Sequence, residues 1–136
     1  MNLNWETLLP NTGEVIVIED DSTLRPLLSD ILQEIGAKTA AFATADDALT
    51  YMLESSHPVP LVIVDYALPG QMQGVEFIAM VQEKWPSMGV ILISGYLLEG
   101  ATIPHGVKYL QKPWSMEELI ESVAEVLQPG KPLRKL

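Results

Sequence analysis

Residues 61–65, with the sequence LVIVD, constrain the fold of this chain more than any other segment. Four apolar residues run directly into one aspartate, Asp65, and the turn residues Pro69 and Gly70 follow shortly afterwards. An uninterrupted apolar run is typical of a strand in a parallel sheet, because helices cover both faces of such a sheet. Open α/β sheets bind ligands at the carboxyl ends of their strands, so Asp65 is predicted to lie at a functional edge.

Apolar runs with strand character alternate with segments of helical periodicity along the chain. Strands are predicted at residues 14–18, 38–42, 61–64, 90–93 and 107–110. Helices are predicted from about Thr23 to Ile35, from Thr44 toward Ser55, over residues 75–85, and from Ser115 to Leu127. This alternation favours a single α/β domain, doubly wound, in which helices cover both faces of a five-stranded parallel sheet.

Several predicted helix ends carry capping residues. Ser22 or Thr23 is expected to cap the first helix, and Gly36 to end it in a left-handed conformation. Ser115 and Glu118 have the spacing of a capping box at the start of the last helix. Residues 94–104 are few and rich in glycine, so only one or two helical turns are predicted there, at residues 96–101.

The composition excludes several classes of function. The 136-residue chain has a formal net charge of −10, which argues against direct binding to nucleic acid. It contains no cysteine, so disulfides, thiolate metal sites and cysteine nucleophiles are excluded. No apolar run approaches the length of a membrane span, and the N-terminus lacks the pattern of a signal peptide. We therefore expect a cytoplasmic chain with no membrane partner.

The predicted domain covers residues 13–128. Residues 1–12 form an N-terminal extension that contains Trp5, Leu8 and Leu9. The sequence leaves open whether this extension docks on the domain, binds a partner or is disordered. Residues 129–136 form a basic tail.

Polar residues follow each strand that is expected near the centre of the sheet. These residues are Glu19, Asp20, Asp21, Asp65, Ser94 and Lys112. The carboxyl ends of parallel strands share one edge, so that edge should hold several acids, one hydroxyl and one lysine. Clustered carboxylates suit a hard divalent cation such as Mg²⁺ or Mn²⁺. A carboxylate beside a metal and a lysine can accept a phosphoryl group as an aspartyl phosphate.

Simpler interpretations of the same residues remain open at this stage. Asp65 could cap the turn before Pro69, and the acids that follow the first strand could form a solvated cap of the first helix. Ser94 could be only a small residue at a strand end, and Lys112 only a surface lysine.

Four motifs together resemble the response-regulator receiver domain of two-component signalling. They are VIVIEDDSTLR, LVIVDYALPG, VILISGY and VKYLQKPW, in that order along the chain. The segment GVKYLQKPW is similar to the receiver domains of hybrid histidine kinases. The resemblance implies a flavodoxin-like fold with the strand order 2-1-3-4-5. The stretch from Ser94 to Lys112 is about one helical turn shorter than is usual in this family, which implies a shortened fourth helix.

The resemblance also implies a role for individual residues. It implies that Asp65 accepts the phosphoryl group and that the metal is bound by Glu19, Asp20, Asp65 and the carbonyl of Ala67. It also implies that Ser94 and Tyr109 are the switch residues and that Lys112 contacts the phosphoryl group. The peptide bond before Pro113 is implied to be cis. Asp20 is implied to bind the metal directly and Glu19 mostly through water, while Asp21 is the more dispensable acid.

The function expected from these residues is that of a stand-alone receiver. A histidine kinase or a histidine phosphotransfer protein would phosphorylate Asp65, and an unknown downstream protein would read the result. The chain would not be an enzyme beyond assisting its own phosphorylation and dephosphorylation. One alternative is a phosphorylation-independent interaction module that uses Leu97, Leu98 and Trp114. A phosphatase with an aspartate nucleophile is disfavoured, because such enzymes place a second aspartate where this chain has Ala67.

Two aromatic residues and both histidines lie near the predicted site or in loops. Tyr96 could overhang the site and restrict water, which with the apolar Ala67 predicts slow self-dephosphorylation. Trp114 is expected either to pack or to contribute to a partner surface. His57 and His105 stand beside prolines in predicted loops and are not expected to donate phosphoryl groups or bind metal.

Overall fold

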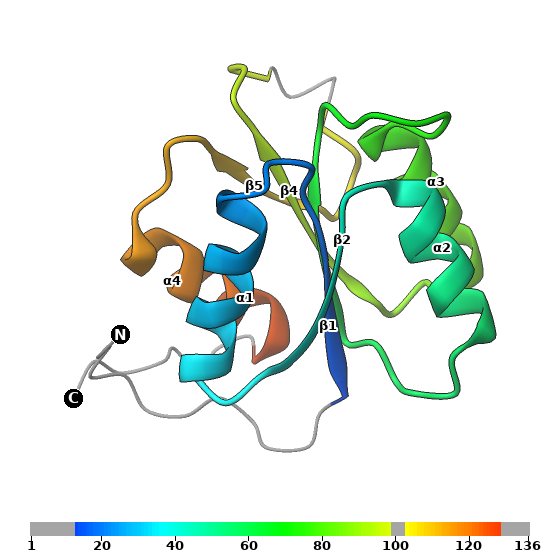
Figure 1. The fold of residues 1–136 in the computed structure, drawn as a ribbon, viewed down its shortest axis with the longest axis horizontal. Helices are drawn as coiled ribbons and strands as arrows, with labels where there is room; N and C mark the ends of the chain where they lie inside the picture. The colour runs from blue at the N-terminus through cyan, green and yellow to red at the C-terminus, as the bar shows by residue number, and fades with distance from the viewer. Residues whose placement is uncertain (1–12, 99–102, 129–136) are drawn as a thin grey trace.

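A parallel five-stranded sheet forms the centre of the computed structural model, which describes residues 13–98 and 103–128. The strands are β1 (Glu14–Ile18), β2 (Lys38–Phe42), β3 (Leu61–Asp65), β4 (Gly89–Ser94) and β5 (Lys108–Gln111). The helices are α1 (Leu24–Glu34), α2 (Ala45–Glu54), α3 (Gly74–Lys84) and α4 (Met116–Leu127). The sheet order is β2-β1-β3-β4-β5 (Figure 1), which confirms the predicted fold class.

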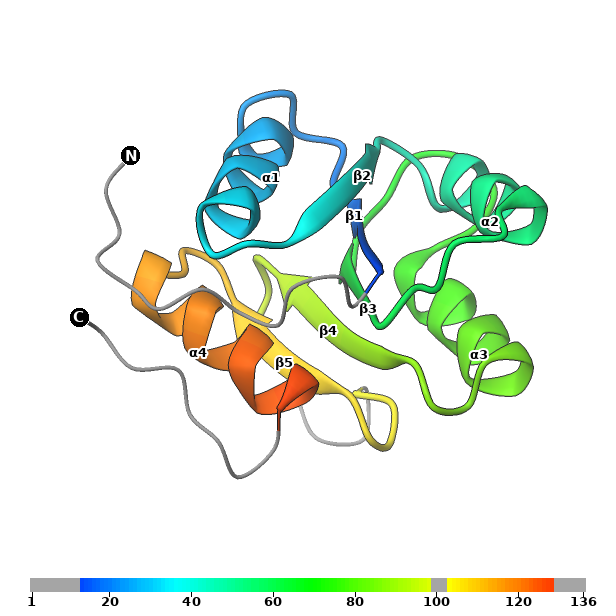
Figure 2. The same cartoon turned by 90° about the horizontal axis from the view of Figure 1, so that it is seen from below.

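Helices cover both faces of the sheet, so the core has two layers. Figure 2 shows α1 and α4 on one side of the sheet and α2 and α3 on the other. Along β3, Leu61 and Ile63 face the layer of α1 and α4, whereas Val62 and Val64 face the layer of α2 and α3. All five residues of β3 are buried, which explains why its sequence has no polar alternation.

The strand register brings the carboxyl ends of the central strands to one edge of the sheet. Ile18 is the pairing partner of Val64, so the residues after β1 lie beside Asp65. On the other side of β3, Asp65 pairs with Ile93. This edge, at the top of Figure 1, therefore gathers the polar residues that the sequence predicts there.

The start of α1 differs from the prediction. The side chain of Thr23 makes no capping hydrogen bond. Instead, Oδ1 of Asp21 accepts hydrogen bonds from the backbone N–H groups of Thr23 (2.8 Å) and Leu24 (2.9 Å). Thr23 therefore holds the N-cap position, as one of the two predicted residues, but the capping hydrogen bonds are supplied by Asp21, two residues earlier, and not by its own side chain.

Other helix ends match their predictions. Gly36 has φ of +92° after the end of α1, a left-handed conformation that glycine adopts without a Cβ clash. The capping box at α4 is present, with Ser115 and Glu118 each accepting from the other's backbone amide at 3.0 and 2.9 Å.

The connection from β4 to β5 contains no helix within its described residues, 95–98 and 103–107. Residues 99–101 of the turn predicted at 96–101 lie outside the described part of the chain. The N-terminal extension with Trp5, Leu8 and Leu9 and the basic tail also lie outside it. None of the helices in the described part combines the length and apolar character needed to span a bilayer.

Candidate functional site

Three carboxylates meet at the carboxyl edge of the sheet. Glu19 and Asp20 follow β1, and Asp65 ends β3. One oxygen of each lies within 4.8 Å of the others. Glu19 and Asp65 are only 2% and 6% exposed, whereas Asp20 is exposed. Two buried acids so close together require a compensating cation, because unpaired buried charge is costly.

Lys112 supplies one compensating charge. Its Nζ lies 2.8 Å from Oε1 of Glu19 and 2.9 Å from Oδ2 of Asp65. Its backbone N–H donates to the carbonyl of Ser94 at 2.7 Å, which holds this lysine against the end of β4. Partial burial by itself would lower the pKa of Lys112, but the hydrogen bonds and charges of the two acids outweigh burial and raise it.

Glu19 occupies the least exposed position of the three acids. Burial raises the pKa of Glu19, the bond from Lys112 opposes that rise, and the nearby Asp65 adds to it. Oε2 of Glu19 also accepts the backbone N–H of Asp21 at 3.2 Å. Both of its carboxylate oxygens therefore have partners, whereas Asp20 is an exposed residue.

The segment after β3 is held by α3. A Cβ at Gly74 would lie 2.4 Å from the carbonyl oxygen of Asp65, so only glycine allows the first turn of α3 to approach this strand so closely. The side chain of Gln73 donates to the carbonyl of Leu68 at 2.9 Å and accepts its N–H at 3.3 Å. Ala67, two residues after Asp65, is exposed within this segment.

A hydroxyl group and an aromatic ring lie on the other side of Asp65. Ser94 is fully buried, and its Oγ accepts the N–H of Tyr96 at 2.9 Å. The hydroxyl of Tyr109 donates to the carbonyl of Tyr96 at 2.7 Å and accepts the N–H of Leu98 at 3.4 Å. Ser94 and Tyr109, the two predicted switch residues, thus hold the same short segment that follows β4.

Tyr96 lies close to the predicted phosphoacceptor. Tyr96 is 65% exposed, and its ring meets the ring of Tyr66, the residue after Asp65, edge-on with 6.5 Å between centroids. The neighbouring Leu97 is 77% exposed. The polar side chains of the site therefore lie beside an exposed apolar surface at this edge of the sheet.

An apolar cavity of about 430 Å³ opens beside Lys112. It is lined by Leu24, Leu27, Gly95, Lys112, Pro113 and Trp114. Trp114 is partly buried and packs against the core layer of α1 and α4, which confirms the packing role, whereas its contribution to a partner surface stays a prediction. The peptide bond between Lys112 and Pro113 is cis, the form implied by the resemblance.

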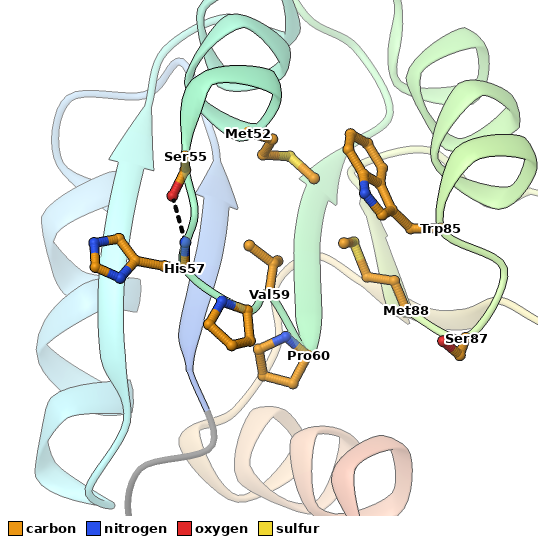
Figure 3. Close-up of a pocket in the computed structure, with 9 residues that line it drawn as sticks. Met52, Ser55, His57, Val59, Pro60, Trp85, Ser87 and Met88 are labelled. Carbon is orange, nitrogen blue, oxygen red and sulfur yellow. Dashed lines mark hydrogen bonds between the residues drawn. The ribbon is translucent and has the colours of Figure 1, made fainter.

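A second cavity, of about 300 Å³, lies at the opposite, amino-terminal edge of the sheet. Figure 3 shows Met52, Val59, Trp85 and Met88 among its lining side chains. His57 is its one titratable lining residue within the described chain, and it is exposed. This cavity offers no set of groups for acid–base or metal chemistry, so the candidate site is at the carboxyl edge.

The site's donor set fits a divalent cation. All three carboxylates offer hard oxygen ligands, and one of them belongs to the exposed Asp20, beside which an entering ion would keep part of its water shell. The ammonium of Lys112 forms its ion pairs with Glu19 and Asp65, not with Asp20.

The fold and this site define a receiver domain. A family model described as the response regulator receiver domain matches residues 15–124. The chain therefore belongs to the family of response regulator receiver domains.

Individual relatives agree with this assignment. The hydrogenase transcriptional regulatory protein HoxA of Cupriavidus necator is 30% identical over 119 residues, which are 84% of this chain and 24% of HoxA. The sensor kinase CckA of Brucella abortus is 28% identical over 126 residues, 90% of this chain and 13% of CckA. The crystal structure of a signal receiver domain of an HD domain-containing protein from Pseudomonas fluorescens Pf-5 has a TM-score of 0.76 at 25% identity. The match covers 85% of this chain and 94% of that structure. The chain spans less than a quarter of HoxA or CckA.

The sequence did not lead us to predict two side chains that hold the loops of the site, those of Gln73 and Arg25. Gln73 with Glu76 has the spacing of a capping box, which was a usable signal even though glutamine is not a favoured cap. Arg25 is a basic residue in the first turn of a helix, an unfavourable place for positive charge that could have marked it.

Proposed function

We propose that this chain accepts a phosphoryl group on Asp65 from a histidine kinase or a histidine phosphotransfer protein, with Mg²⁺ (or Mn²⁺) bound. The observation that carries the proposal is the contact of Lys112 with both Asp65 and Glu19 at the edge of the sheet. A lysine and a metal-binding acid at the acceptor are the two groups that phosphoryl transfer to a carboxylate requires.

In the proposed reaction, a carboxylate oxygen of Asp65 attacks the phosphorus of a phosphohistidine. The phosphorus–nitrogen bond breaks, the imidazole leaves with the electron pair, and an acyl phosphate forms on Asp65. Lys112 is close enough to turn its ammonium from Asp65 to a phosphoryl oxygen. Glu19, Asp20, Asp65 and the carbonyl of Ala67 would hold the cation, which when bound would offset charge on the phosphoryl oxygens.

Ser94 and Tyr109 would convert this event into a change of surface. Ser94 Oγ accepts the N–H of Tyr96, so its own hydroxyl hydrogen can be donated to a phosphoryl oxygen. Movement of Ser94 would then shift the backbone of Tyr96 and Leu98, to which the hydroxyl of Tyr109 is also hydrogen-bonded. The proposed output is therefore a protein contact at the exposed Tyr96 and Leu97, reached by a shift between two arrangements of this segment.

The phosphodonor is proposed to dock beside the acceptor. The cavity next to Lys112 has apolar walls from Leu24, Leu27 and Trp114, which suit the side chains of a partner helix. Such docking would place a histidine of the partner above Asp65.

Several parts of this proposal are predictions from the sequence. They are the absence of enzymatic activity on other substrates, a cytoplasmic location and the stand-alone character of the receiver. HoxA is described as a transcriptional regulatory protein and CckA as a sensor kinase, so receivers similar to this chain occur within longer proteins of both kinds.

The first prediction concerns Asp65→Asn, which should abolish phosphorylation and leave the fold intact, because the amide is not a nucleophile of comparable strength. Intact mass is measured after incubation with Mg²⁺ and a small-molecule phosphodonor such as acetyl phosphate. The native chain should gain one phosphoryl group, and the variant none.

Asp30→Asn is the matched control, because Asp30 is an exposed acid on α1 away from the site, and it should label like the native chain. Labelling of Asp65→Asn at native stoichiometry would contradict the proposal. A native chain that takes up no phosphoryl group would favour the phosphorylation-independent interaction module.

A further inference from the structure

Arg25 lies where a helix disfavours positive charge. It is the second residue of α1, in the turn where the helix macrodipole is positive. Asp21 already provides the favourable negative charge and the cap at this end. The arginine is therefore not explained by helix stability.

The contacts of Arg25 point away from its own helix and into the preceding loop. Nη1 of Arg25 donates to the carbonyl of Glu19 at 2.9 Å and to the carbonyl of Asp20 at 3.3 Å. These carbonyls belong to the two residues after β1 whose carboxylates meet Asp65. One guanidinium nitrogen thus joins the backbone of both acids to the first turn of α1.

The rest of this loop is fixed by Asp21. Its carboxylate accepts the amides of Thr23 and Leu24, and its own N–H donates to Glu19 Oε2. Asp21 therefore fixes the loop where it enters the helix, and Arg25 fixes it where it leaves the strand. Among these side-chain contacts, only the one from Arg25 reaches the backbone of Asp20. Without Arg25, these contacts would position that backbone only through the neighbouring residues of the chain.

We propose that Arg25 is a positioning residue for the metal site: it holds the backbone of Glu19 and Asp20 so that their carboxylates converge with Asp65. This inference rests on the divalent cation of the proposed function. Arg25 does not touch the cation or the phosphoryl group, and acts through the loop that carries the ligands.

Electrostatics and positioning predict opposite effects when Arg25 is neutralised. Loss of a positive charge near the site would, by Coulomb's law alone, tighten the binding of Mg²⁺. Loss of the two hydrogen bonds would let the ligand loop relax and would weaken Mg²⁺ binding. The sign of the change in affinity therefore distinguishes the two.

The experiment is a Mg²⁺ titration of the full chain, followed by NMR through the amide shifts of Asp20 and Asp21, with thermal melts to verify that each variant is folded. Arg25→Gln should bind Mg²⁺ about tenfold more weakly, the scale typical for loss of a residue that orients a metal ligand. Arg25→Lys keeps the charge but not the planar fork, so its affinity should fall between those of Arg25→Gln and the native chain.

Lys108→Gln is the matched control, since it removes a positive charge that pairs with Glu125 away from the site, and its Mg²⁺ affinity should be native. Affinity of Arg25→Gln equal to or tighter than native would overturn the inference and leave the proposed function standing. Affinity in Arg25→Lys above that of a weakly binding Arg25→Gln would support the inference, because lysine can still donate to the carbonyls of Glu19 and Asp20, whereas loss of charge alone would tighten binding. A native chain that binds no Mg²⁺ would instead overturn the metal site itself, and the inference with it.

Discussion

The two sides of Asp65 are built from different interactions. On the side of β1, the buried carboxylate of Glu19 pairs with the ammonium of Lys112, which reaches across from the end of β5. On the side of β4, neutral groups of Ser94 and Tyr109 hold backbone amides and carbonyls. Hydrogen bonds between charged groups are roughly twice as strong as neutral ones. We infer that the acid side (Glu19 and Lys112) holds a fixed geometry, while the hydroxyl side (Ser94 and Tyr109) can exchange its hydrogen-bond partners.

The largest expected effect tests the acid side. Lys112→Met should lower the free energy of unfolding by about 2–3 kcal/mol without divalent cation, because it leaves two close carboxylates without their cation. The value lies below that of a fully buried pair because the lysine side chain is 23% exposed. Urea denaturation in EDTA and in Mg²⁺ measures it, and Mg²⁺ should restore part of the loss.

Lys108→Met is the control for this prediction, since the pair of Lys108 with Glu125 is exposed and should contribute about 0–1 kcal/mol. Equal losses in the two variants, or no recovery in Mg²⁺, would show that the acid side is not a charge-based cluster.

The next prediction tests the hydroxyl side. Tyr109→Phe removes one hydroxyl that bonds Tyr96 and Leu98, so it should lower the free energy of unfolding by about 1 kcal/mol. The loss should be the same in EDTA and in Mg²⁺, because no charge is involved. Urea denaturation under both conditions decides this, and a loss that Mg²⁺ reverses would erase the distinction between the two sides.

A smaller effect is expected on the lifetime of the phosphoryl group. Tyr96→Ala removes a ring that packs edge-on against Tyr66 beside Asp65, so water should reach the acyl phosphate more readily. Hydrolysis should become about threefold faster, equivalent to about 0.6 kcal/mol in the barrier. Decay of radiolabel from the purified phosphorylated chain measures this rate. Leu97→Ala, which changes the neighbouring exposed residue, should decay like the native chain.

Ala67→Asn gives an independent test, because an amide there can orient a hydrolytic water and should also shorten the lifetime. A lifetime left unchanged by Tyr96→Ala or by Ala67→Asn would refute this account of slow self-dephosphorylation.

The smallest expected effect comes from a contact that joins a neutral hydroxyl to a charged acid, away from the site. Tyr51 donates its hydroxyl to Glu14, and this bond, with some burial, raises the pKa of Tyr51 above its ordinary value of 10.0. The phenol therefore stays protonated to higher pH in the folded chain than in the unfolded chain. Its contribution to stability is complete below about pH 10 and is lost as the pH rises through the raised pKa.

The difference in unfolding free energy between the native chain and Tyr51→Phe, measured from pH 8 upward, checks this sign. The difference should be constant at first and shrink at alkaline pH. A difference that grows with pH would contradict the direction of the shift.

Those features of the fold that depend on local pattern could be predicted from the sequence. The apolar run of β3 identifies a strand buried on both faces, and the strand order follows from the family resemblance. Glu19, Asp65 and Lys112 could be predicted to meet, because parallel strands end at one edge.

Features that depend on competition between neighbouring groups could not be predicted. Asp21, Ser22 and Thr23 can all cap a helix, and only the path of the loop decides that Asp21 does so. The sequence also does not tell which of Glu19 and Asp20 is buried, because that depends on where Lys112 reaches. The bonds of Tyr109 to the segment after β4 likewise depend on a loop whose conformation no periodicity encodes.

The open space at Gly95 allows a fluorescent label to be attached beside the site. A Cβ at that position would meet no atom within 4 Å, although Gly95 follows Ser94 directly and lines the cavity beside Lys112. Because the chain has no cysteine, Gly95→Cys would introduce a unique thiol. An environment-sensitive dye attached there would sit between the acceptor and the proposed docking cavity. Its emission would follow phosphorylation and partner binding in real time.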